Sequence, residues 1–425
     1  MTITSDVSTD DDSAPIRALL SKPSFLSIWG VGGLSGVVRW FQLLALGIYT
    51  FEITGSPLLV SSIPVLWMLP LTLFGPLFGV ISEQVDRKIL LISSLVSVTL
   101  LQIVMAGLAN AGELNYEVVA IASFLSGLFW ATDIPLRRRV LGDLAGSRIS
   151  AAMSLDSATG NATRMAGPLL GGVVLQWLGM FGVFTLSGAL YGSCALLVVL
   201  TRVPGRTGVG MIPNILSDLA GGVHFVLGDK KLRRILLITI VFNVWGFPFT
   251  SMIPIVGRDE LGLSPFLVGV VSSMEGFGAF VGALVVAVLA HRENFFNIYV
   301  FGTVLYLTMI GYLSLLTSVA GGPYHSLIAT GLTLTVIGIG SACFAAMQST
   351  LTYLAAPPEY RSRVLGVLTL CIGAGPLGFF NVGWMAEEFG VSAALAIISA
   401  EGLVALLVLW AWSESVGTAK VEAAE

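Results

Sequence analysis

The stretch Lys88–Ala109, KILLISSLVSVTLLQIVMAGLA, decides the fold of this chain. It contains no charged side chain after its first residue. An α-helix needs about 20 mostly apolar residues to cross the hydrocarbon core of a bilayer. The stretch therefore predicts a membrane-spanning helix. Strands are excluded, because lipid offers no partner for the unpaired backbone groups of an open sheet.

Eleven further segments of the same kind lie on either side of this one. The composition agrees with them, since 55% of the residues are apolar and only 11% are charged, against roughly 25% charged residues in a soluble domain. We therefore expect an all-α membrane protein with twelve transmembrane helices. The predicted spans cover residues 25–51, 57–82, 88–109, 117–139, 151–178, 181–201, 234–256, 265–290, 296–317, 326–354, 362–386 and 391–413.

The basic residues predict how the spans are oriented. Eighteen of the 21 Lys and Arg residues fall in one set of alternate loops, in the tails and at the adjoining helix ends, whereas the opposite loops hold only Arg258. Loops rich in Lys and Arg stay in the cytoplasm. Both termini are thus predicted to be cytoplasmic, which requires an even number of spans.

The longest internal break separates two groups of six spans. Ser56-Pro57-Leu58-Leu59-Val60 opens the second span and Ser264-Pro265-Phe266-Leu267-Val268 opens the eighth, so the groups resemble two copies of one unit. The break also holds an amphipathic stretch from Ile215 to Leu227. The predicted divisions are a disordered tail at 1–24, a six-helix bundle at 25–201, a cytoplasmic linker with a surface helix at 202–233, a second bundle at 234–413 and a tail at 414–425.

Three motifs carry a resemblance to one family. They are Trp40-Phe41-Gln42 followed by Ile53-Thr54-Gly55-Ser56-Pro57, then Asp133-Ile134-Pro135-Leu136-Arg137, and then Arg164-Met165-Ala166-Gly167-Pro168-Leu169-Leu170-Gly171-Gly172. They resemble segments of the major facilitator superfamily, and in particular of its drug:proton antiporter-3 branch of enterobactin-exporter-like transmembrane secretion effectors. The resemblance runs over all twelve spans. It implies two pseudo-symmetric six-helix halves that give access to a central site from each side in turn.

The loop after the second span departs from the family pattern. The family pattern is Gly, three residues, Asp-Arg and then basic residues, and the loop acts as a conformational latch. Here three residues separate Gly79 from Glu83-Gln84-Val85-Asp86-Arg87-Lys88, with Glu in place of the Asp and Gln in place of the first Arg. We expect Gly79, Glu83, Asp86, Arg87 and Lys88 to act in gating; the alternative is that the basic pair only fixes topology.

The third motif has a physical interpretation as well. Pro168 removes a backbone donor and bends its helix, whereas Gly167, Gly171 and Gly172 permit close helix contact. The family associates this kink with export, and the alternative is simple tight packing. Asp133, Pro135, Arg137 and Arg164 match family elements and are expected to serve gating. For Asp133 and Arg164 a structural role is equally in keeping with this expectation, and contact with the substrate is the alternative.

Ionisable residues inside spans are costly and face a cavity or a partner. Since none of the three histidines lies within a span, a proton carrier would have to be a carboxylate. Glu275, near the middle of the eighth span, is the candidate, with a structural salt bridge as the alternative. Arg39, in the middle of the first span, is expected to contribute charge in the cavity, either by binding an anionic group or by pairing with an acid. The other cavity candidates are polar or aromatic residues on the helices expected to line the cavity: Gln42, Trp130, Asn161, Asn243, Trp245, Gln348 and Asn381.

These features predict a proton-coupled exporter of a small amphipathic organic solute such as a siderophore, drug or metabolite. Uptake of a vitamin-like or other organic anion, or of an iron-related solute, is an alternative, and a non-transporting sensor or assembly factor is another. The sequence lacks a nucleotide-binding Gly-x-x-x-x-Gly-Lys-Ser/Thr loop and metal-ligand spacing. We expect a non-enzymatic monomer in the bacterial cytoplasmic membrane, with the lipid bilayer, protons and its solute as partners, and no cofactor, metal or nucleic acid.

Overall fold

The computed structural model describes residues 15–203, 215–319 and 323–422, and at 15, 75–84, 215–216, 218, 319, 323–326 and 413–422 it describes the backbone alone. In these ranges the chain is helical and has no strand. The helices are α1 (Pro15–Leu20), α2 (Pro23–Thr54), α3 (Pro57–Gln84), α4 (Arg87–Ala111), α5 (Tyr116–Ala145), α6 (Ile149–Leu200), α7 (Ile215–Gly228), α8 (Lys230–Val241), α9 (Ile253–Ile255), α10 (Pro265–Leu289), α11 (Phe295–Val319), α12 (Pro323–Ala355), α13 (Arg361–Ile372), α14 (Gly375–Phe389) and α15 (Val391–Glu422).

The predicted spans agree with these helices. Ten stretches of the described residues are long and apolar enough to cross a membrane, and one of them, Tyr116–Leu200, is 85 residues long. That stretch contains three predicted spans. The fourth lies in α5, and the fifth and sixth lie in α6 on either side of a break at Gly179, whose φ of 61° suits glycine. The twelve predicted spans are therefore all present, which confirms the all-α membrane fold.

Two spans are broken in a way that the sequence analysis did not predict. The seventh continues from α8 through a π-helical turn at Phe242–Gly246, a 3₁₀ turn at Phe247–Ser251, and α9. Pro248 and Pro254 lie in this region, and each lacks the backbone N–H that a regular helix needs. The eleventh span is divided into α13 and α14.

The predicted tails differ from the structure at their inner ends. Residues 1–14 and 423–425 lie outside the described residues. Pro15–Leu20 forms the short helix α1, and α15 continues to Glu422, beyond the predicted end of the last span at 413. Part of the predicted linker, 204–214, is also outside the description, but the amphipathic stretch is the helix α7 as expected.

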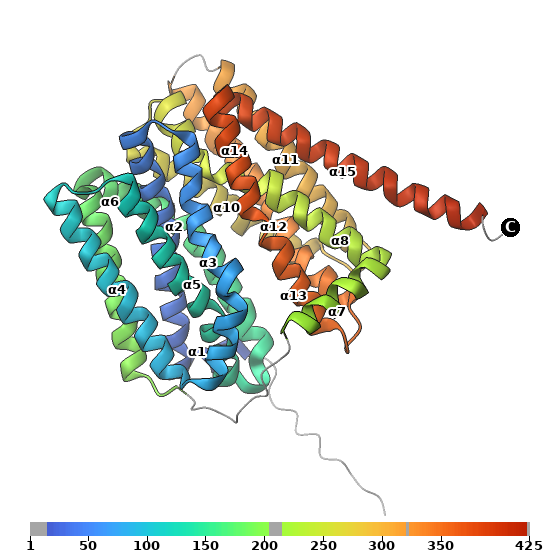
Figure 1. Ribbon diagram of the computed structural model, residues 1–425, viewed down its shortest axis with the longest axis horizontal. Coiled ribbons are helices and arrows are strands. Elements are labelled where there is room, and N and C mark those ends of the chain that lie inside the picture. The colour runs from blue at the N-terminus through green and yellow to red at the C-terminus, as the bar shows by residue number, and fades with distance from the viewer. Residues whose placement is uncertain (1–14, 204–214, 320–322, 423–425) are drawn as a thin grey trace, which may run out of the picture.

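Apolar side chains form two main cores. One core joins α1 to α6 and contains buried Phe25, Phe41 and Phe184. The other lies mainly among α8 to α15, where it contains buried Tyr299 and Tyr306, and it also includes Leu44 and Ile48 of α2 and Val60 of α3. Figure 1 shows these two groups side by side, with α2 to α6 on one side and α8 to α15 on the other. We propose that the predicted boundaries 25–201 and 234–413 delimit two halves.

The linker helix α7 belongs with the second group. Phe225 stacks on Tyr360 with 4.3 Å between ring centroids. Val226 joins Leu232 and Val364 in a small buried cluster with α8 and α13. Both ribbon views place α7 near α13, at the same end of the molecule as α1.

The opposite end, which we call the distal end, holds the turns at 55–56, 261–264 and 390. Here polar groups join the two halves: Arg258 pairs with Glu52 at 2.8 Å, and the Glu387 carboxylate accepts hydrogen bonds from the Ser56 hydroxyl at 2.7 Å and the Leu58 amide at 3.2 Å. These contacts close the distal end between the halves. Further polar contacts between the halves are the hydrogen bond that the Phe266 amide donates to Gln176 and the bonds that Arg164 donates.

Glycines let α6 and α10 approach each other between the halves. A Cβ on Gly172 would lie 2.6 Å from the Pro265 carbonyl oxygen, and one on Gly269 would lie 2.6 Å from the Pro168 carbonyl oxygen. A Cβ on Gly276 would lie 2.5 Å from the Met165 nitrogen. We call Gly172, Gly269 and Gly276 the glycine seam. Backbone contact of this kind drives helix association in lipid.

Replacing Gly172 with leucine should therefore separate α6 from α10. Overpacking of a tight site costs about 1–3 kcal/mol, so the purified variant should melt at least a few degrees below the wild type. Gly107→Leu is the matched control, because a Cβ on Gly107 meets nothing within 4 Å. Thermal unfolding in detergent checks this; equal melting temperatures for the two variants would contradict the packing role of the seam.

Candidate functional site

A cavity of about 240 Å³ lies between the two halves. Its walls come from α2, α3, α5 and α6 on one side and from the broken seventh span, α10 and α14 on the other. Most of the lining is apolar or aromatic, including Trp40, Trp67, Trp130, Phe247 and Phe379. Three ionisable side chains face it: Arg39, Arg164 and Glu275. A concave, mainly apolar pocket with a few polar groups is typical of small-molecule sites.

Glu275 and Arg164 form an ion pair across the two halves. The Arg164 guanidinium donates to Glu275 Oε1 at 2.5 Å and to the Ser341 hydroxyl at 3.1 Å. Both charged side chains are buried, with 5% of Glu275 and 14% of Arg164 exposed. The next residue, Gly276, belongs to the glycine seam, so the ion pair occurs where the backbones of α6 and α10 meet. The pair therefore links the halves beside the cavity.

Arg39 has a different environment. Its guanidinium carbon lies 4.7 Å from the ring centroid of Trp40, 5.2 Å from that of Trp130 and 5.7 Å from that of Trp67. Trp67 and Trp130 are themselves 4.2 Å apart. Cation–π attraction over an indole contributes roughly 0.5–2 kcal/mol. No described carboxylate pairs with Arg39, and its Nε is buried without a hydrogen-bond partner.

The Gly-Pro motif of α6 serves both neighbours of this helix. A Cβ on Gly167 would lie 2.4 Å from Trp40 Cβ, and one on Gly171 would lie 2.7 Å from the Phe41 carbonyl oxygen, so these two glycines admit α2. Gly172 admits α10, and Pro168 lines the cavity. The spacing of these glycines thus places α6 against α2 of the first half and α10 of the second.

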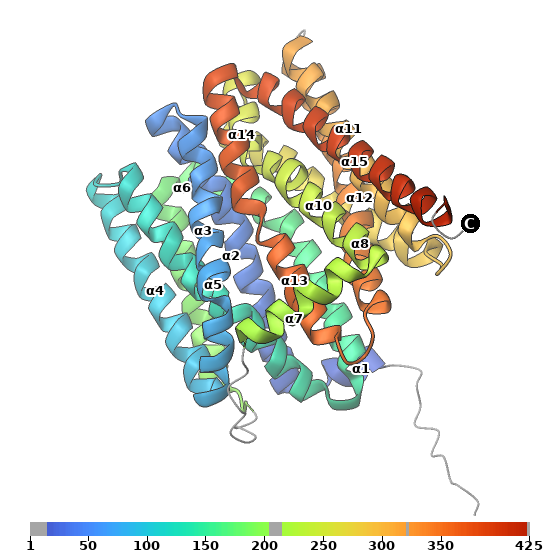
Figure 2. The same ribbon diagram turned by 45° about the vertical axis from the view of Figure 1, so that its right-hand side comes forward.

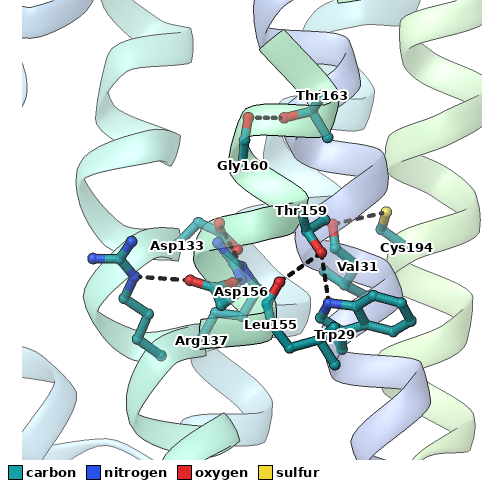
Figure 3. Close-up of polar contacts among 11 residues, drawn as sticks. Trp29, Val31, Asp133, Arg137, Leu155, Asp156, Thr159, Gly160, Thr163 and Cys194 are labelled. Carbon is teal, nitrogen blue, oxygen red and sulfur yellow. Dashed lines mark hydrogen bonds and ion pairs between the residues drawn. The ribbon is translucent and has the colours of Figure 1, made fainter. Parts of the chain in front are cut away.

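Asp133, Pro135 and Arg137 lie on α5, away from the cavity. Arg137 donates to Asp133 at 3.2 Å and to Asp156 of α6 at 2.8 Å, and Arg138 donates to Asp156 at 3.0 Å. Figure 3 shows Asp133, Arg137 and Asp156 gathered between the helices, near Trp29 and Thr159. A Cβ on Gly32 of α2 would lie 2.3 Å from Arg137, so this glycine makes room for the guanidinium. The cluster fastens α5 to α6 inside the first half.

In the loop after α3, three of the residues predicted to act in gating have contacts in the structure. Asp86 accepts hydrogen bonds from the amides of Lys88 and Ile89 and caps α4. Arg87 pairs with Asp143 of α5, and Lys88 donates to the Val199 carbonyl of α6 at 2.8 Å. All these contacts are within the first half. The side chains at Gly79 and Glu83 lie outside the described residues, so the latch remains a prediction.

Six of the predicted cavity residues are not among those that line this cavity. Neighbours in the same half satisfy four of them: Gln42 bonds to Gln102 and Ser187, Asn243 to the Thr239 carbonyl, Trp245 to Glu401, and Gln348 to the Thr239 hydroxyl. Asn161 and Asn381 are half-buried on α6 and α14 and are not part of the cavity wall. Arg39, Trp130, Arg164 and Glu275 do line it.

Apart from Trp130, the sequence analysis missed the aromatic wall of the site. Trp40 follows Arg39 directly, and Trp67 occupies in the first repeat the position that Glu275 occupies in the second, but neither tryptophan was predicted to line the cavity. Phe247 lies in the broken seventh span, 5.8 Å from the Arg164 guanidinium carbon, and nothing in the local pattern indicated it. Among the described residues, no three His, Cys, Asp or Glu side chains are grouped to hold a metal.

Comparison with known proteins identifies the family. Residues 28–376 match the model of the Major Facilitator Superfamily, and the chain belongs to this superfamily of membrane transporters. Macrolide efflux protein A of Streptococcus pyogenes is 20% identical over 87% of this chain and 91% of its own length. The staphyloferrin A transporter of Staphylococcus aureus is 23% identical over 81% of this chain and 84% of its own. The multidrug efflux pump Tap of Mycolicibacterium fortuitum is 23% identical over 86% and 90%.

Solved structures agree on the fold. The nucleoside transporter NupG superposes with a TM-score of 0.71 at 13% identity, covering 91% of this chain and 98% of its own. A bacterial homologue of the iron transporter ferroportin, in an inward-facing state, gives a TM-score of 0.66 at 16% identity, covering 93% and 99%. At these identities the likeness concerns the fold alone, and confirms the major facilitator architecture.

Removing Arg137 should unfold much of the protein, because two carboxylates would remain in the interior without their shared cation. Breaking a buried pair costs about 3–5 kcal/mol. Arg138→Gln is the matched control, since its side chain is 54% exposed and exposed pairs contribute about 0–1 kcal/mol. We expect Arg137→Leu to give little monodisperse protein in size-exclusion chromatography, and Arg138→Gln a near-normal yield. A normal yield and melting temperature for Arg137→Leu would contradict this assignment.

Proposed function

We propose that this transporter exports a small amphipathic organic solute across the bacterial cytoplasmic membrane, in exchange for protons and as a monomer. The mainly aromatic cavity supports an amphipathic solute. Relatives named for macrolide efflux, multidrug efflux and staphyloferrin A transport support export. With the predicted topology, both termini are cytoplasmic and the distal end faces outward. The contacts that close this end then belong to the state that is open to the cytoplasm.

The observation that carries the proposal is the Arg164–Glu275 ion pair, which joins α6 to α10 beside the cavity. Because the ion pair joins the two halves, the contact between α6 and α10 depends on the charges of Arg164 and Glu275. A proton on Glu275 removes its charge and ends the ion pair. A solute group that bonds to Arg164 also competes with Glu275. Either ligand therefore frees α6 from α10, whereas the empty, deprotonated carrier keeps the pair.

In the exchange cycle the solute and the proton break the ion pair in turn, each for one direction of movement. At the cytoplasmic side the solute displaces Glu275 from Arg164, the halves separate at the distal end, and the solute leaves outward. A proton from outside then neutralises Glu275 and allows the return. Release of that proton into the cytoplasm restores the ion pair. The halves move as rigid units about the cavity, as in other carriers built from repeats.

Uptake of an organic anion is the second candidate, and Arg39 favours it. The cavity has two arginines and one glutamate, a formal excess of one positive charge. A proton on Glu275 raises that excess, so that a proton and an anion would bind together more readily than either alone. Movement of both in one direction would then be uptake. The direction of proton flux distinguishes the two candidates.

Glu275→Gln should abolish solute-driven proton movement, because glutamine cannot take up the proton, while downhill solute exchange persists. The assay uses proteoliposomes containing the pH dye pyranine, with erythromycin and 2-naphthoate as probe solutes. Glu401→Gln is the matched control, since its side chain accepts from Trp245 outside the cavity, and it should behave as the wild type. Undiminished solute-driven proton flux in Glu275→Gln would remove the coupling role from this residue.

A further inference from the structure

We infer that Arg39, held in an aromatic cage by Trp40, Trp67 and Trp130, is the binding site for an anionic group of the transported solute. This inference rests on the proposed function, because it treats the cavity as the solute site. It specifies the solute class as an organic anion with a planar apolar body, whichever direction transport takes.

The first argument is the missing counter-ion. A charge removed from water is costly unless it is paired. The other buried cations on α5 and α6 have carboxylate partners, Arg137 with Asp133 and Asp156, and Arg164 with Glu275. In the described part of the chain, Arg39 has neither an acidic partner nor a hydrogen bond. An unpaired cation that lines a cavity is suited to take its counter-ion from a ligand that enters the cavity.

The second argument is that the cage positions the guanidinium without consuming its donors. Three indole rings lie within 5.7 Å of its carbon atom. Stacking on ring faces uses the plane of the guanidinium, and leaves its edge available for a two-point bond to a carboxylate. Trp67 and Trp130 form part of the same cavity wall, so an aromatic body attached to the anion finds ring surfaces beside it.

The third argument is the charge of the surroundings. Arg164 also contacts Trp40, with its guanidinium carbon 5.3 Å from the ring centroid. The two guanidinium carbons are therefore at most 10 Å apart, the sum of their distances of 4.7 Å and 5.3 Å from that centroid. Their combined field attracts an anion and repels a cation, although Glu275 offsets one of the two charges. A second acceptor on the solute would reach toward Arg164.

The test measures binding, with no pH gradient, to the purified full-length protein in dodecyl maltoside. Isothermal titration compares 2-naphthoate, neutral 2-naphthamide and the cation 2-naphthylmethylammonium. A charge-assisted bond is about twice as strong as a neutral one, so wild-type protein should bind the anion about tenfold or more tightly than the amide, and the cation most weakly. Arg39→Gln should remove the preference for the anion, and Arg39→Lys should restore part of it. Arg292→Gln, an exposed arginine elsewhere, should retain the wild-type preference.

Folding is followed in parallel. Since Arg39 has no carboxylate partner within the protein, Arg39→Gln should melt close to the wild-type temperature, and 2-naphthoate should raise the melting temperature of the wild type but not of Arg39→Gln. Equal anion affinity in Arg39→Gln and wild type, a preference for the cation, or no binding of millimolar 2-naphthoate would each overturn the inference. Anion binding without any solute-driven proton flux would instead remove the proposed coupling and leave the Arg39 site in place.

Discussion

The ion pair between Arg164 and Glu275 is the interaction on which the rest of this structure depends. It joins α6 to α10 where no side chain separates the two backbones, because the glycine seam removes the Cβ atoms that would keep them apart. A buried ion pair adds little net stability, but losing one partner is strongly unfavourable. The pair thus makes contact between the halves depend on the charge of one carboxylate.

The surroundings of this pair explain why the two halves differ in chemistry. The first half supplies Arg39, Arg164 and the three tryptophans, and the second supplies Glu275, Phe247 and Phe379. Arg87, Arg137 and Arg138 of the first half pair with Asp143, Asp133 and Asp156 within the same half. Of the two arginines that line the cavity, Arg164 pairs with Glu275, whereas Arg39 is available to a ligand.

Much of the fold was predictable from hydropathy, because a bilayer imposes the same length and apolar composition on every span. The predicted segment 88–109 became α4, which runs from Arg87 to Ala111. The breaks in the seventh span were not predicted, since Pro248 and Pro254 occur in an apolar run whose length still fits one span. Whether such a proline bends or interrupts a helix depends on its neighbours, and here the Pro254 ring lies against Gly47.

The site was predictable mainly in its charged residues, with Trp130 beside them. Glu275, Arg164 and Arg39 attracted attention because an ionisable group inside a span must face a cavity or a partner, although Arg164 was expected to serve gating. The positions of Gln42 and Gln348 were harder to predict, because an uncharged amide can form its hydrogen bonds with any nearby acceptor or hydroxyl. Here those partners lie on other helices, and the sequence alone does not show which helices are neighbours. Trp40 and Trp67 were missed because aromatic residues occur on lipid-facing and cavity-facing sides alike.

The most direct test of the account is the distance between the halves at the distal end. Spin labels at Glu113 and Glu388, both exposed, would report it by pulsed electron resonance in a variant lacking the buried Cys194, Cys343 and Cys371. If the Arg164–Glu275 pair holds α6 to α10, a short distance should dominate near neutral pH, and a longer one should appear at low pH and in Glu275→Gln at any pH. An unchanged distance distribution in Glu275→Gln would contradict the account.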